Sequence, residues 1–345
     1  MVVGRNEGER LKRSLESVVG SVESVVYVDS GSTDGSLEHA KDLGIEVVEL
    51  GPERPFTAAR SRNEGVRRLE EIRPGVRLVQ FVDGDCALHP GWLQAGCRFL
   101  EENGEFAAVA GRLREMHPEG SVYNRLCQME WDVPAGEAEQ CGGIVLMRKE
   151  AFDAVGGFRE ELTAGEEPEL CARLRRAGWR IMRLPDEMAT HDAGITRFGQ
   201  WWKRCRRGGH AAMQGWSLTG VDGWSHSRAT VLRALAWGGA FPVLVVSVVA
   251  GLALGGLLRT AAAALLMAIF LVALQLIRIT WNRHRRESDL SQAATFAAYN
   301  MLSKIPEAIG VLEHLVNSML GRRTKLVEYK GEGGLGSRSG PEGPA

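Results

Sequence analysis

Two long apolar runs without a charged residue constrain this chain more than any other feature of its sequence. The first run extends from Ala234 to Leu258 and the second from Thr260 to Ile277, with Arg259 alone between them. Each is about as long as a helix that crosses a bilayer, although the second lies near the lower limit. Two buried core helices of a soluble protein, or a shallow re-entrant pair, are the alternatives. The pattern predicts a helical hairpin in a membrane.

Basic residues flank this hairpin at both of its ends. Arg228 and Arg233 precede the first run, and four more arginines follow the second: Arg278, Arg283, Arg285 and Arg286. The cytoplasmic flanks of membrane helices carry an excess of Lys and Arg. We therefore expect the large N-terminal part of the chain at the cytoplasmic face of the cell (inner) membrane.

The overall charge and the cysteines exclude other classes of protein. The 42 Lys and Arg residues nearly balance the 43 Asp and Glu residues, so the chain has no electrostatic signature of a nucleic-acid partner. Its 6 cysteines show no C-x-x-C spacing, a distribution typical of reduced thiols and not of zinc ligands or a disulfide framework.

The first 75 residues alternate between helical and strand patterns. β-branched and aromatic residues predict strands at Val25–Val28 and Glu46–Leu50, and Asn6–Val19 and Ser36–Leu43 have helical character. Repetition of strand, turn and helix predicts an α/β fold with a doubly wound, mostly parallel sheet that is covered by helices on both faces.

The same alternation continues to Leu184 with one exception. The segment Leu113–Gln140, which contains Trp131, has no clear pattern and is expected to be irregular. We expect further helices up to about Glu71 and at Pro90–Asn103, Lys149–Val155 and Leu170–Ala177, and further strands at Leu78–Val82, Ala107–Arg112, Gly142–Met147 and Trp179–Leu184.

Two carboxylates stand at the end of one of these strands. The run Leu78–Val82 is followed by Asp83, Gly84 and Asp85, so a strand delivers both acids to a loop. In an open α/β sheet, ligands bind beyond the carboxyl ends of the strands. Mg²⁺ and Mn²⁺ prefer carboxylate, phosphate and water oxygens. Asp83 and Asp85 are therefore the first candidates for a metal or ligand site, and an ordinary surface turn is the alternative.

Three further segments carry candidate chemistry. Acids cluster around Glu166 and Glu167, where they can favour a helix N-terminus or supply a general base. His191 follows a predicted strand and a turn, and it is either structural or a metal ligand. The stretch Gln200–His210 combines two tryptophans with four cations, which suits a membrane interface, a diphosphate, or both.

The end of the chain has two parts. Six apolar residues recur at intervals of three and four and form one stripe of a helix: Leu302, Ile305, Ile309, Leu312, Val316 and Met319. Such a helix fits the membrane interface, a position on the globular part, or a packed core. From Gly331 the chain is rich in Gly, Ser and Pro, which is typical of a disordered tail.

Several short motifs together resemble a family 2 glycosyltransferase. They occur in the order of that family between Val2 and His210: Arg5–Glu7, Val28–Asp34, Ala59–Gly65, Asp83–Asp85, Gly156–Phe158 and Gly165–Glu167. The hairpin that follows is similar to that of membrane-attached members. The resemblance implies a GT-A fold, an inverting transfer from a nucleotide-diphosphate sugar, and a Mg²⁺ or Mn²⁺ ion that bridges the diphosphate.

The resemblance also implies roles for single residues. Asp85 matches the metal ligand, His191 lies where many members supply a further metal or diphosphate contact, and Asp83 matches the residue that faces the ribose and the sugar. Two residues match nucleoside-binding positions and two more lie nearby: Glu7 and Asp29, with Arg62 and Asn63.

The catalytic base of the family is the second acid of a Glu-Asp pair, so Glu167 matches it and Glu166 precedes it. Glu167 is one methylene longer than the Asp of the family pattern. Ser30 replaces a second Asp that contacts the nucleobase in many members, and Gln200–Arg207 is an altered version of the Gln-x-x-Arg-Trp motif of processive relatives.

These features predict an arrangement of five segments. A GT-A domain at residues 1–215 is followed by a juxtamembrane linker at 216–233, two transmembrane helices at 234–281, an amphipathic interfacial helix at 291–330 and a disordered tail at 331–345. The expected activity is metal-dependent transfer of a sugar to a hydroxyl of a lipid-linked or glycolipid acceptor. A polyprenyl-phosphate glycosyltransferase and an inactive membrane scaffold are the alternatives.

Overall fold

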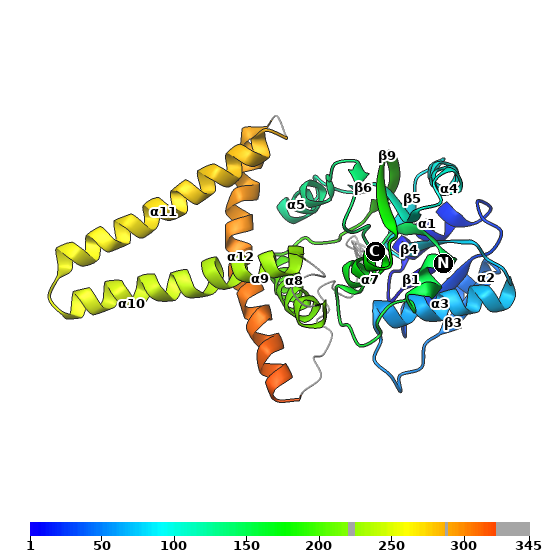
Figure 1. Ribbon diagram of the computed structural model, residues 1–345, viewed down its shortest axis with the longest axis horizontal. Coiled ribbons are helices and arrows are strands. Elements are labelled where there is room, and N and C mark those ends of the chain that lie inside the picture. Colours follow the sequence, from blue (N-terminus) through cyan, green and yellow to red (C-terminus); the bar gives the residue numbers. More distant parts are fainter. Residues whose placement is uncertain (220–224, 287–288, 322–345) are drawn as a thin grey trace, which may run out of the picture.

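The protein consists of a layered α/β part and a helical part that projects from it (Figure 1). The computed structural model describes residues 1–219, 225–286 and 289–321. The strands are β1 (Val2–Gly4), β2 (Val26–Asp29), β3 (Glu46–Glu49), β4 (Leu78–Asp83), β5 (Cys86–Leu88), β6 (Phe106–Glu115), β7 (Gly136–Glu137), β8 (Val145–Arg148) and β9 (Arg180–His191). The helices of the α/β part are α1 (Glu9–Val18), α2 (Ser36–Asp42), α3 (Ala58–Ile72), α4 (Trp92–Glu102), α5 (Val122–Trp131), α6 (Lys149–Ala154) and α7 (Glu166–Arg176). The projecting part contains α8 (Phe198–Thr219), α9 (Ser225–Ala234), the π-helical turn η1 (Leu235–Ala240), α10 (Phe241–Leu254), α11 (Leu258–His284) and α12 (Leu290–Met319).

One sheet forms the centre of the α/β part, with the strand order β3-β2-β1-β4-β8-β6-β9-β5 and with β7 beside β9. The strands β3, β2, β1 and β4 are parallel, whereas β8 is antiparallel to its neighbours β4 and β6. The predicted α/β class with a mostly parallel, mixed sheet is confirmed. The parallel strands β1, β2 and β4 end at the same edge of the sheet, and this edge carries the candidate site.

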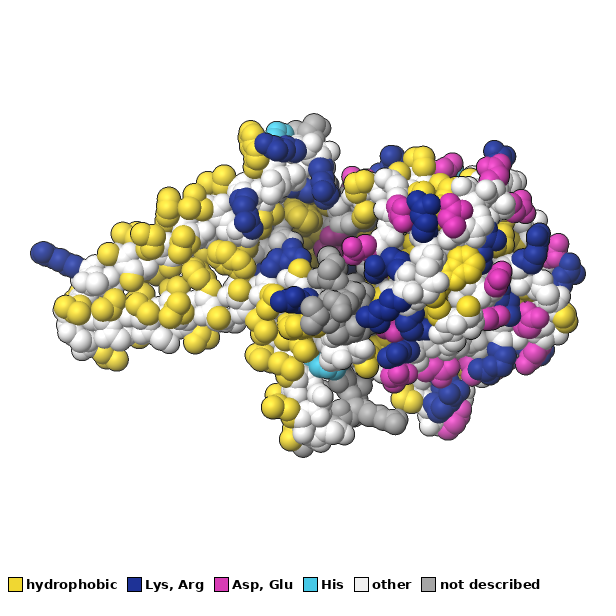
Figure 2. All heavy atoms as spheres, viewed as in Figure 1, with side chains coloured by type: hydrophobic (Ala, Val, Ile, Leu, Met, Phe, Trp, Pro, Cys, Tyr) yellow, Lys and Arg dark blue, Asp and Glu magenta, His cyan; other side chains and the backbone are white. Residues whose placement is uncertain are grey.

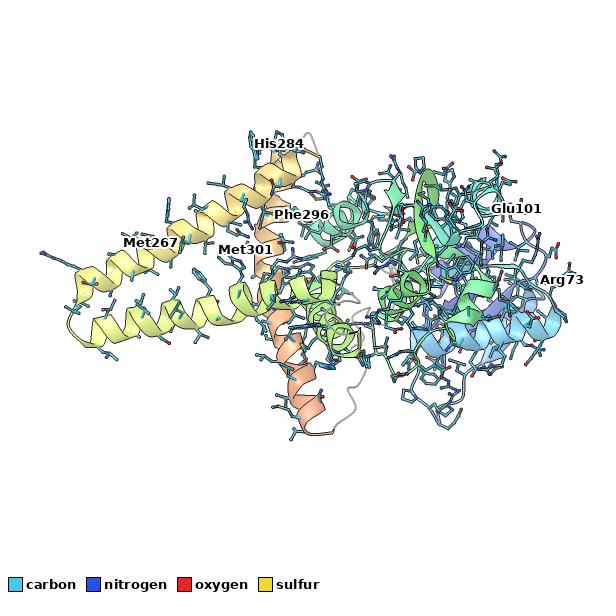
Figure 3. All side chains as sticks on the ribbon, viewed as in Figure 1. Arg73, Glu101, Met267, His284, Phe296 and Met301 are labelled. Atoms are coloured by element: carbon cyan, nitrogen blue, oxygen red, sulfur yellow. The ribbon has the colours of Figure 1, made fainter. Side chains whose placement is uncertain are left out.

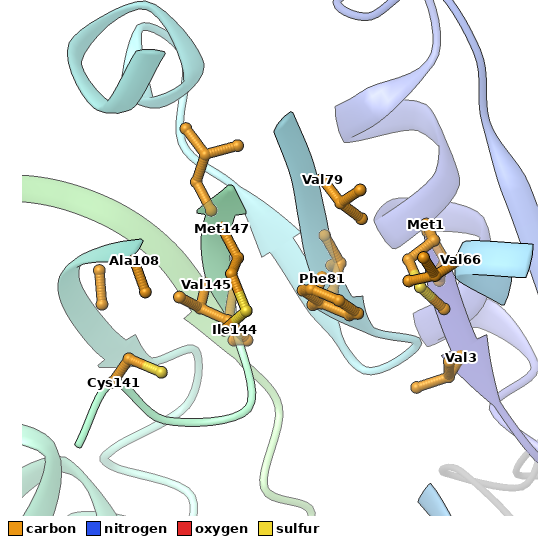
Figure 4. Close-up of a cluster of buried hydrophobic side chains, with 14 of the residues drawn as sticks. Met1, Val3, Val66, Val79, Phe81, Ala108, Cys141, Ile144, Val145 and Met147 are labelled. Atoms are coloured by element: carbon orange, nitrogen blue, oxygen red, sulfur yellow. The ribbon is translucent and has the colours of Figure 1, made fainter. Parts of the chain in front are cut away.

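The strand β4 is held firmly in the main core (Figure 4). Phe81 is almost completely buried, and its ring lies 5.8 Å from that of Phe152 and 5.6 Å from that of Phe158. Aromatic pairs at this spacing add about 0.5–1.5 kcal/mol each to the stabilisation that comes from burial. The packing of β4 therefore fixes the position at which its last residue, Asp83, leaves the sheet.

Two helices begin at positions that differ from the predicted ones. Helix α1 begins at Glu9 and not at Asn6, because Asn6 has a positive φ of 54° and cannot continue a right-handed helix. Helix α7 begins at Glu166 and not at Leu170, directly after Gly165 with its φ of 80°. Glu166 and the following Glu167 thus lie in the first turn of a helix and not in a loop.

Two predictions in the middle of the chain were also wrong. The strand β9 does not end at Leu184 but continues to His191, which is its last residue. The segment Leu113–Gln140 is not irregular throughout, because it contains α5. Ser121 caps this helix by accepting a hydrogen bond of 3.0 Å from the backbone N–H of Asn124. A serine before an apolar run was the signal that the sequence offered.

Two apolar helical segments form the hairpin that extends from the α/β part in Figure 1. The most apolar 18-residue stretch of the first, Ser227–Leu254, has a mean hydropathy of 2.0, and that of the second, α11, has one of 2.4. At 1.5 Å per residue each is about 40 Å long, which exceeds the hydrocarbon thickness of about 30 Å. Hydrophobic side chains cover the hairpin (Figure 2), and Met267 of α11 points away from the protein (Figure 3). Both segments are thus long and apolar enough to cross a membrane.

The predicted juxtamembrane linker at 216–233 is helical where the structure describes it, because α8 continues to Thr219 and α9 begins at Ser225. The hairpin therefore starts from a helical base. The predicted tail from Gly331, like the end of the predicted interfacial helix, lies outside the described residues.

Helix α12 crosses the base of the hairpin and packs closely against α8. Glycines allow this close approach. A Cβ atom on Gly209 of α8 would overlap the backbone of Glu307, and a Cβ atom on Gly310 of α12 would overlap the backbone of Arg206. The two helices therefore meet backbone to backbone, as small residues permit between membrane helices.

The apolar stripe of α12 lies on the opposite side of this contact. Its residues are between 37% and 86% exposed: Leu302, Ile305, Ile309, Leu312, Val316 and Met319. The buried side of α12 instead carries small residues such as Ala297 and Ala308. The large apolar side chains thus face away from the protein and remain available to another apolar phase.

Candidate active site

A buried arginine joins two of the predicted site residues. Arg62 of α3 donates hydrogen bonds to Asp83 Oδ1 at 2.7 Å and to Glu166 Oε1 at 2.6 Å. The side chains of Arg62 and Glu166 are only 4% and 13% exposed, so this ion pair is shielded from water, whereas Asp83 is 33% exposed. The arginine thereby connects the end of β4 to the first turn of α7.

The charge of Glu166 is set by two opposing effects. Burial disfavours the ionised carboxylate, but the neighbouring Arg62 outweighs it and lowers the pKa of Glu166. The positive charge of Arg207 in α8 also lowers the pKa of Glu166. Glu166 is therefore an anion that orients Arg62, and its lowered pKa makes it a weak proton acceptor.

The metal candidates Asp85 and His191 lie side by side. In the sheet, His191 at the end of β9 is paired with Cys86 of β5, the residue that follows Asp85. This register places His191 Nε2 at 3.0 Å from Asp85 Oδ2. The imidazole also stacks on the indole of Trp131 of α5, with centroids 4.5 Å apart and planes inclined by 15°. Strand pairing and stacking together fix the orientation of the imidazole.

The electrostatics of this pair suit a cation. Burial lowers the pKa of His191, which favours the neutral imidazole that metal ions require. The carboxylates of Asp83, Glu115 and Glu7 raise the pKa of the same imidazole, so several negative charges surround His191. Donor atoms of Asp85, Cys86 and His191 lie within 4.8 Å of one another. The residues present thus fit a divalent cation with carboxylate and imidazole ligands.

Glu167 is held by a different group of residues. Its Oε1 atom accepts hydrogen bonds from the backbone N–H of Cys141 at 2.7 Å and from the thiols of Cys141 and Cys171 at 3.2 and 3.1 Å. Burial raises the pKa of the Cys171 thiol well above its usual value, so the thiol is a neutral donor. The predicted base is therefore anchored at one oxygen, next to the loop that leads into β8.

Glu7 lies beside the turn between the two aspartates. A Cβ atom on Gly84 would lie 3.2 Å from Glu7 Cγ and from the carbonyl oxygen of Val3. Glu7 also forms an ion pair of 2.8 Å with Arg10. The absence of a side chain at Gly84 therefore lets the turn pack directly on β1 and on Glu7.

The carboxylate of Asp29 shapes a loop at the same edge of the sheet. Its Oδ2 accepts hydrogen bonds from the backbone N–H groups of Gly31 and Ser32, each at 2.8 Å, and Oδ1 accepts one from the hydroxyl of Tyr27 at 2.8 Å. Asp29 thus holds the polar turn that follows β2 in place.

Asn63 does not join the group around Asp83. Its side-chain amide accepts a hydrogen bond of 2.9 Å from the N–H of Phe158 and donates one of 2.8 Å to the carbonyl of the same residue. Asn63 therefore fixes the Gly156–Phe158 turn, which is one of the motifs that the sequence singled out.

Sequence reasoning missed the residues that hold these side chains in place. The sequence pattern assigns no role to Trp131, because it predicts an irregular segment where α5 lies. The spacing of Cys141 and Cys171 is that of scattered thiols, and their side chains meet at Glu167 only through the fold. No pattern in the sequence indicates this meeting, whereas the serine cap of α5 does indicate the helix that carries Trp131.

Known proteins with similar sequences are glycosyltransferases or take part in polysaccharide biosynthesis. The profile described as "Glycosyl transferase family 2" matches residues 1–156, and "N-terminal domain of galactosyltransferase" matches residues 125–193. Glycosyltransferase AglE of Haloferax volcanii is 25% identical over 232 residues, which cover 63% of this chain and 73% of AglE. Succinoglycan biosynthesis protein ExoA of Rhizobium meliloti is 27% identical over 197 residues, or 51% of this chain and 57% of ExoA.

A solved structure shares the fold. Mannosyltransferase PcManGT from Pyrobaculum calidifontis, in complex with GDP-Man and Mn²⁺, superposes with a TM-score of 0.53 at 19% identity over 87% of this chain and 86% of that chain. The shared fold is GT-A, and the family model together with the curated relatives identifies the protein as a glycosyltransferase.

More narrowly, residues 1–156 of this chain match the model of glycosyl transferase family 2. Its two long apolar helices indicate that it is associated with a membrane. These findings confirm the predicted family and fold class, and they favour an enzyme over an inactive scaffold.

Proposed function

We propose that this enzyme transfers a sugar from a nucleotide-diphosphate donor to a membrane-associated acceptor, with inversion at the anomeric carbon. The observation that carries the proposal is the convergence of two groups at one edge of the sheet. The buried pair of Asp85 and His191 suits a divalent cation, and Arg62 links Asp83 to Glu166 beside it. The complex of PcManGT with GDP-Man and Mn²⁺ supports both the donor class and the metal.

Asp85 and His191 would hold Mg²⁺ or Mn²⁺, because a carboxylate oxygen and a neutral imidazole nitrogen suit these cations, Mn²⁺ in particular. When bound, the ion offsets negative charge on the donor diphosphate and makes it a better leaving group. Trp131 stacks on His191 and so keeps its imidazole in one orientation.

Five residues are assigned to the donor, in three kinds of role. Asp83 faces the sugar and ribose, and Arg62 holds its carboxylate in place. Glu7 and Asp29 bind the nucleoside, and Asp29 also shapes the loop after β2. Asn63 acts indirectly, because its amide positions the backbone of Phe158.

Glu167 is assigned as the general base. Its carboxylate takes the proton of an acceptor hydroxyl while the hydroxyl oxygen forms a bond to the anomeric carbon. The bond from that carbon to the diphosphate oxygen breaks on the opposite face, and the nucleotide diphosphate leaves with the electron pair. Hydrogen bonds from Cys141 anchor one oxygen of Glu167 and so orient the carboxylate. Glu166 supports the site as the anion that orients Arg62.

A polyprenyl-phosphate glycosyltransferase is the second candidate. In that reaction an acceptor phosphate oxygen attacks, and no strong base is needed. The burial of Glu167, at 8% exposure, and its engagement with two thiols favour this alternative.

The variant Glu167→Gln separates the two candidates. Glutamine keeps an oxygen that accepts from Cys141 but cannot accept the acceptor proton. For a hydroxyl acceptor we expect a loss of about 10²-fold or more in kcat, the usual contribution of a general base. Activity close to that of the wild type would exclude the hydroxyl mechanism. Glu161→Gln, at an exposed position in the preceding loop, is the matched control and should keep full activity.

The metal assignment is tested without turnover. Nucleotide diphosphates with different bases are added to the full chain with and without Mn²⁺, and thermal stability is measured. A ligand at 100 times its Kd stabilises the folded state by about 2.7 kcal/mol. We expect a Mn²⁺-dependent increase in the wild type and in the exposed control Asp186→Ala, and none in Asp85→Ala. An unchanged shift in Asp85→Ala would refute the assignment.

We further place the catalytic domain at the cytoplasmic face of the cell membrane. Arg228 and Arg233 lie at the start of the first apolar segment, whereas Arg259 is the one cation beside the described turn between the two helices. Of the arginines at the other end, Arg283 is buried and donates to the carbonyl of Met129, so it also docks the hairpin on α5. Protease accessibility of the α/β part in inside-out vesicles tests this orientation.

A further inference from the structure

A cavity of about 500 Å³ lies between the α/β part and the base of the hairpin. It is lined by α5, α8, α9 and α12, together with the loops that precede β8 and α7. None of the residues assigned to the donor or to the metal lines it. The cavity is therefore a second recess, separate from the proposed donor site.

One wall of this cavity reaches the proposed catalytic residues. Gln140 lines the cavity and directly precedes the residue whose N–H donates to Glu167. Ala164 lines it as well and lies two residues before Glu166. Arg207 of α8 completes this wall and acts electrostatically on Glu166. A molecule in the cavity would thus lie next to the first turn of α7.

The opposite wall belongs to the membrane anchor. Ser227 and Thr230 of α9 line the cavity, and they are part of the continuous apolar segment that ends at Leu254. Phe296 and Tyr299 of α12 close it from another side, and Figure 3 labels Phe296 on the part of α12 near α5. In Figure 1, α12 runs across the direction of the hairpin, as expected of a helix that lies along the surface of a membrane that the hairpin crosses. The cavity therefore connects the level of that surface with the reaction centre.

Two guanidinium groups in the lining of the cavity can contact an anion. Arg204 and Arg207 both line it, and Arg204 pairs with Glu130 at 2.7 Å. The other lining acid, Glu307, is compensated by Lys304 at 2.6 Å. The two arginines of the lining thus equal its two acids in number, and Arg207 is the lining cation on the side of α7. Guanidinium groups bind phosphate oxygens with paired hydrogen bonds, which makes arginine suited to phosphate recognition.

The remaining lining is amphipathic. The rings of Trp201, Phe296 and Tyr299 offer apolar surface, while Asn300 and Ser303 offer polar atoms. A free sugar does not need a path to the membrane helices, and a simple lipid does not need the two arginines. An occupant that uses all of these features has an apolar chain, a phosphate and a polar head.

We infer that this cavity is the acceptor site and that it binds the phosphate or diphosphate of a lipid-linked acceptor. Arg207, assisted by Arg204, holds the phosphate. The lipid chain leaves along α9 towards the membrane, and the reacting group points to Glu167. The inference rests on the proposed function, because it assumes that sugar transfer occurs at the first turn of α7.

The test measures binding and needs no turnover. Three probes are titrated by calorimetry into the purified full chain in detergent: farnesyl diphosphate, inorganic diphosphate and farnesol. We expect farnesyl diphosphate to bind at least about tenfold more tightly than either partial probe, since it alone satisfies both the arginines and the apolar wall. An excess of UDP or GDP with Mn²⁺ should not displace it. Equal binding of all three probes, or displacement by a nucleotide, would overturn the inference.

Variants locate the site. Arg207→Gln should weaken farnesyl diphosphate binding by about tenfold, the effect of losing one charged hydrogen bond. Arg206→Gln is the matched control, because the neighbouring Arg206 pairs with Glu313 and does not line the cavity. Thr230→Phe should narrow the lipid side and weaken farnesyl diphosphate but not inorganic diphosphate. Unchanged binding in both Arg207→Gln and Thr230→Phe would refute the assignment.

The outcome can be separated from that of the proposed function. One outcome is that nucleotides raise thermal stability with Mn²⁺ as expected while farnesyl diphosphate binds the cavity variants as tightly as the wild type. In that case only the assignment of the acceptor site is wrong. If the nucleotide shift itself is absent, the proposed donor chemistry fails, whatever the probe does.

Discussion

The glycine contact between α8 and α12 allows a quantitative test of how the catalytic domain is joined to its anchor. In Gly209→Ala, the new Cβ would lie 2.6 Å from Glu307 Cα and C, which belong to rigid helix backbone. Carbon atoms in contact prefer about 3.5–4.0 Å, so the helices must separate by about 1 Å. Overpacking of this kind costs about 1–3 kcal/mol.

The neighbouring Gly208 provides the control. It is exposed, and a Cβ at this position would meet nothing within 4 Å. Alanine stabilises a helix by about 1 kcal/mol relative to glycine at either position. The difference in the free energy of unfolding between Gly209→Ala and Gly208→Ala therefore measures the cost of the clash alone. We expect Gly209→Ala to be about 1–3 kcal/mol less stable than Gly208→Ala, equivalent to a difference in Tm of about 1–4 °C for a chain of this length.

The assay is thermal unfolding of the full chain in detergent, followed by tryptophan fluorescence. Limited proteolysis provides a local readout, because loosening of the crossing should expose α12 to cleavage before the α/β part unfolds. Equal Tm values and equal cleavage of α12 in the two variants would show that the helices do not meet backbone to backbone at Gly209.

Two further predictions concern buried charges. Arg62→Gln leaves the carboxylates of Asp83 and Glu166 without their shared partner, and we expect it to destabilise the protein by about 3–5 kcal/mol in a denaturant titration; Arg67→Gln, on an exposed face of the same helix, should change stability by less than about 1 kcal/mol. Burial lowers the pKa of His210 from 6.5 to about 4, so the unfolded chain binds more protons between these values and stability should fall as pH drops from 6.5 towards 4. A Tm that falls as steeply with pH in His210→Gln as in the wild type would contradict this origin.

The candidate site was predictable where a local pattern controls it. Asp83 and Asp85 could be assigned to the end of a strand because the apolar run of β4 precedes them directly. The bridge from Asp83 through Arg62 to Glu166 was not predictable, since it joins residues up to 104 positions apart. The thiol contacts of Glu167 depend in the same way on the packing of α7 against the loop before β8.

The C-terminal helices illustrate a second limit of sequence patterns. The stripe from Leu302 to Met319 predicts a helix correctly, but it does not say which face packs on the protein. In water the large apolar face would be buried, whereas here it is exposed and the face with Ala297, Ala308 and Gly310 packs. Small residues favour close helix contacts when the surrounding phase is itself apolar. The solvent, which the sequence does not specify, decides which face turns inward.

The contact between α12 and α8 also has a mechanical consequence. Helix α12 contacts α8, α11 and η1 at once, so these helices cannot tilt independently. At its other side, α8 holds the loop before Glu166 through hydrogen bonds from Thr163 to Gln214. A long apolar hairpin adjusts its tilt to the thickness of the bilayer. Because that tilt is transmitted through rigid contacts to the first turn of α7, bilayer thickness becomes a variable of the active-site geometry.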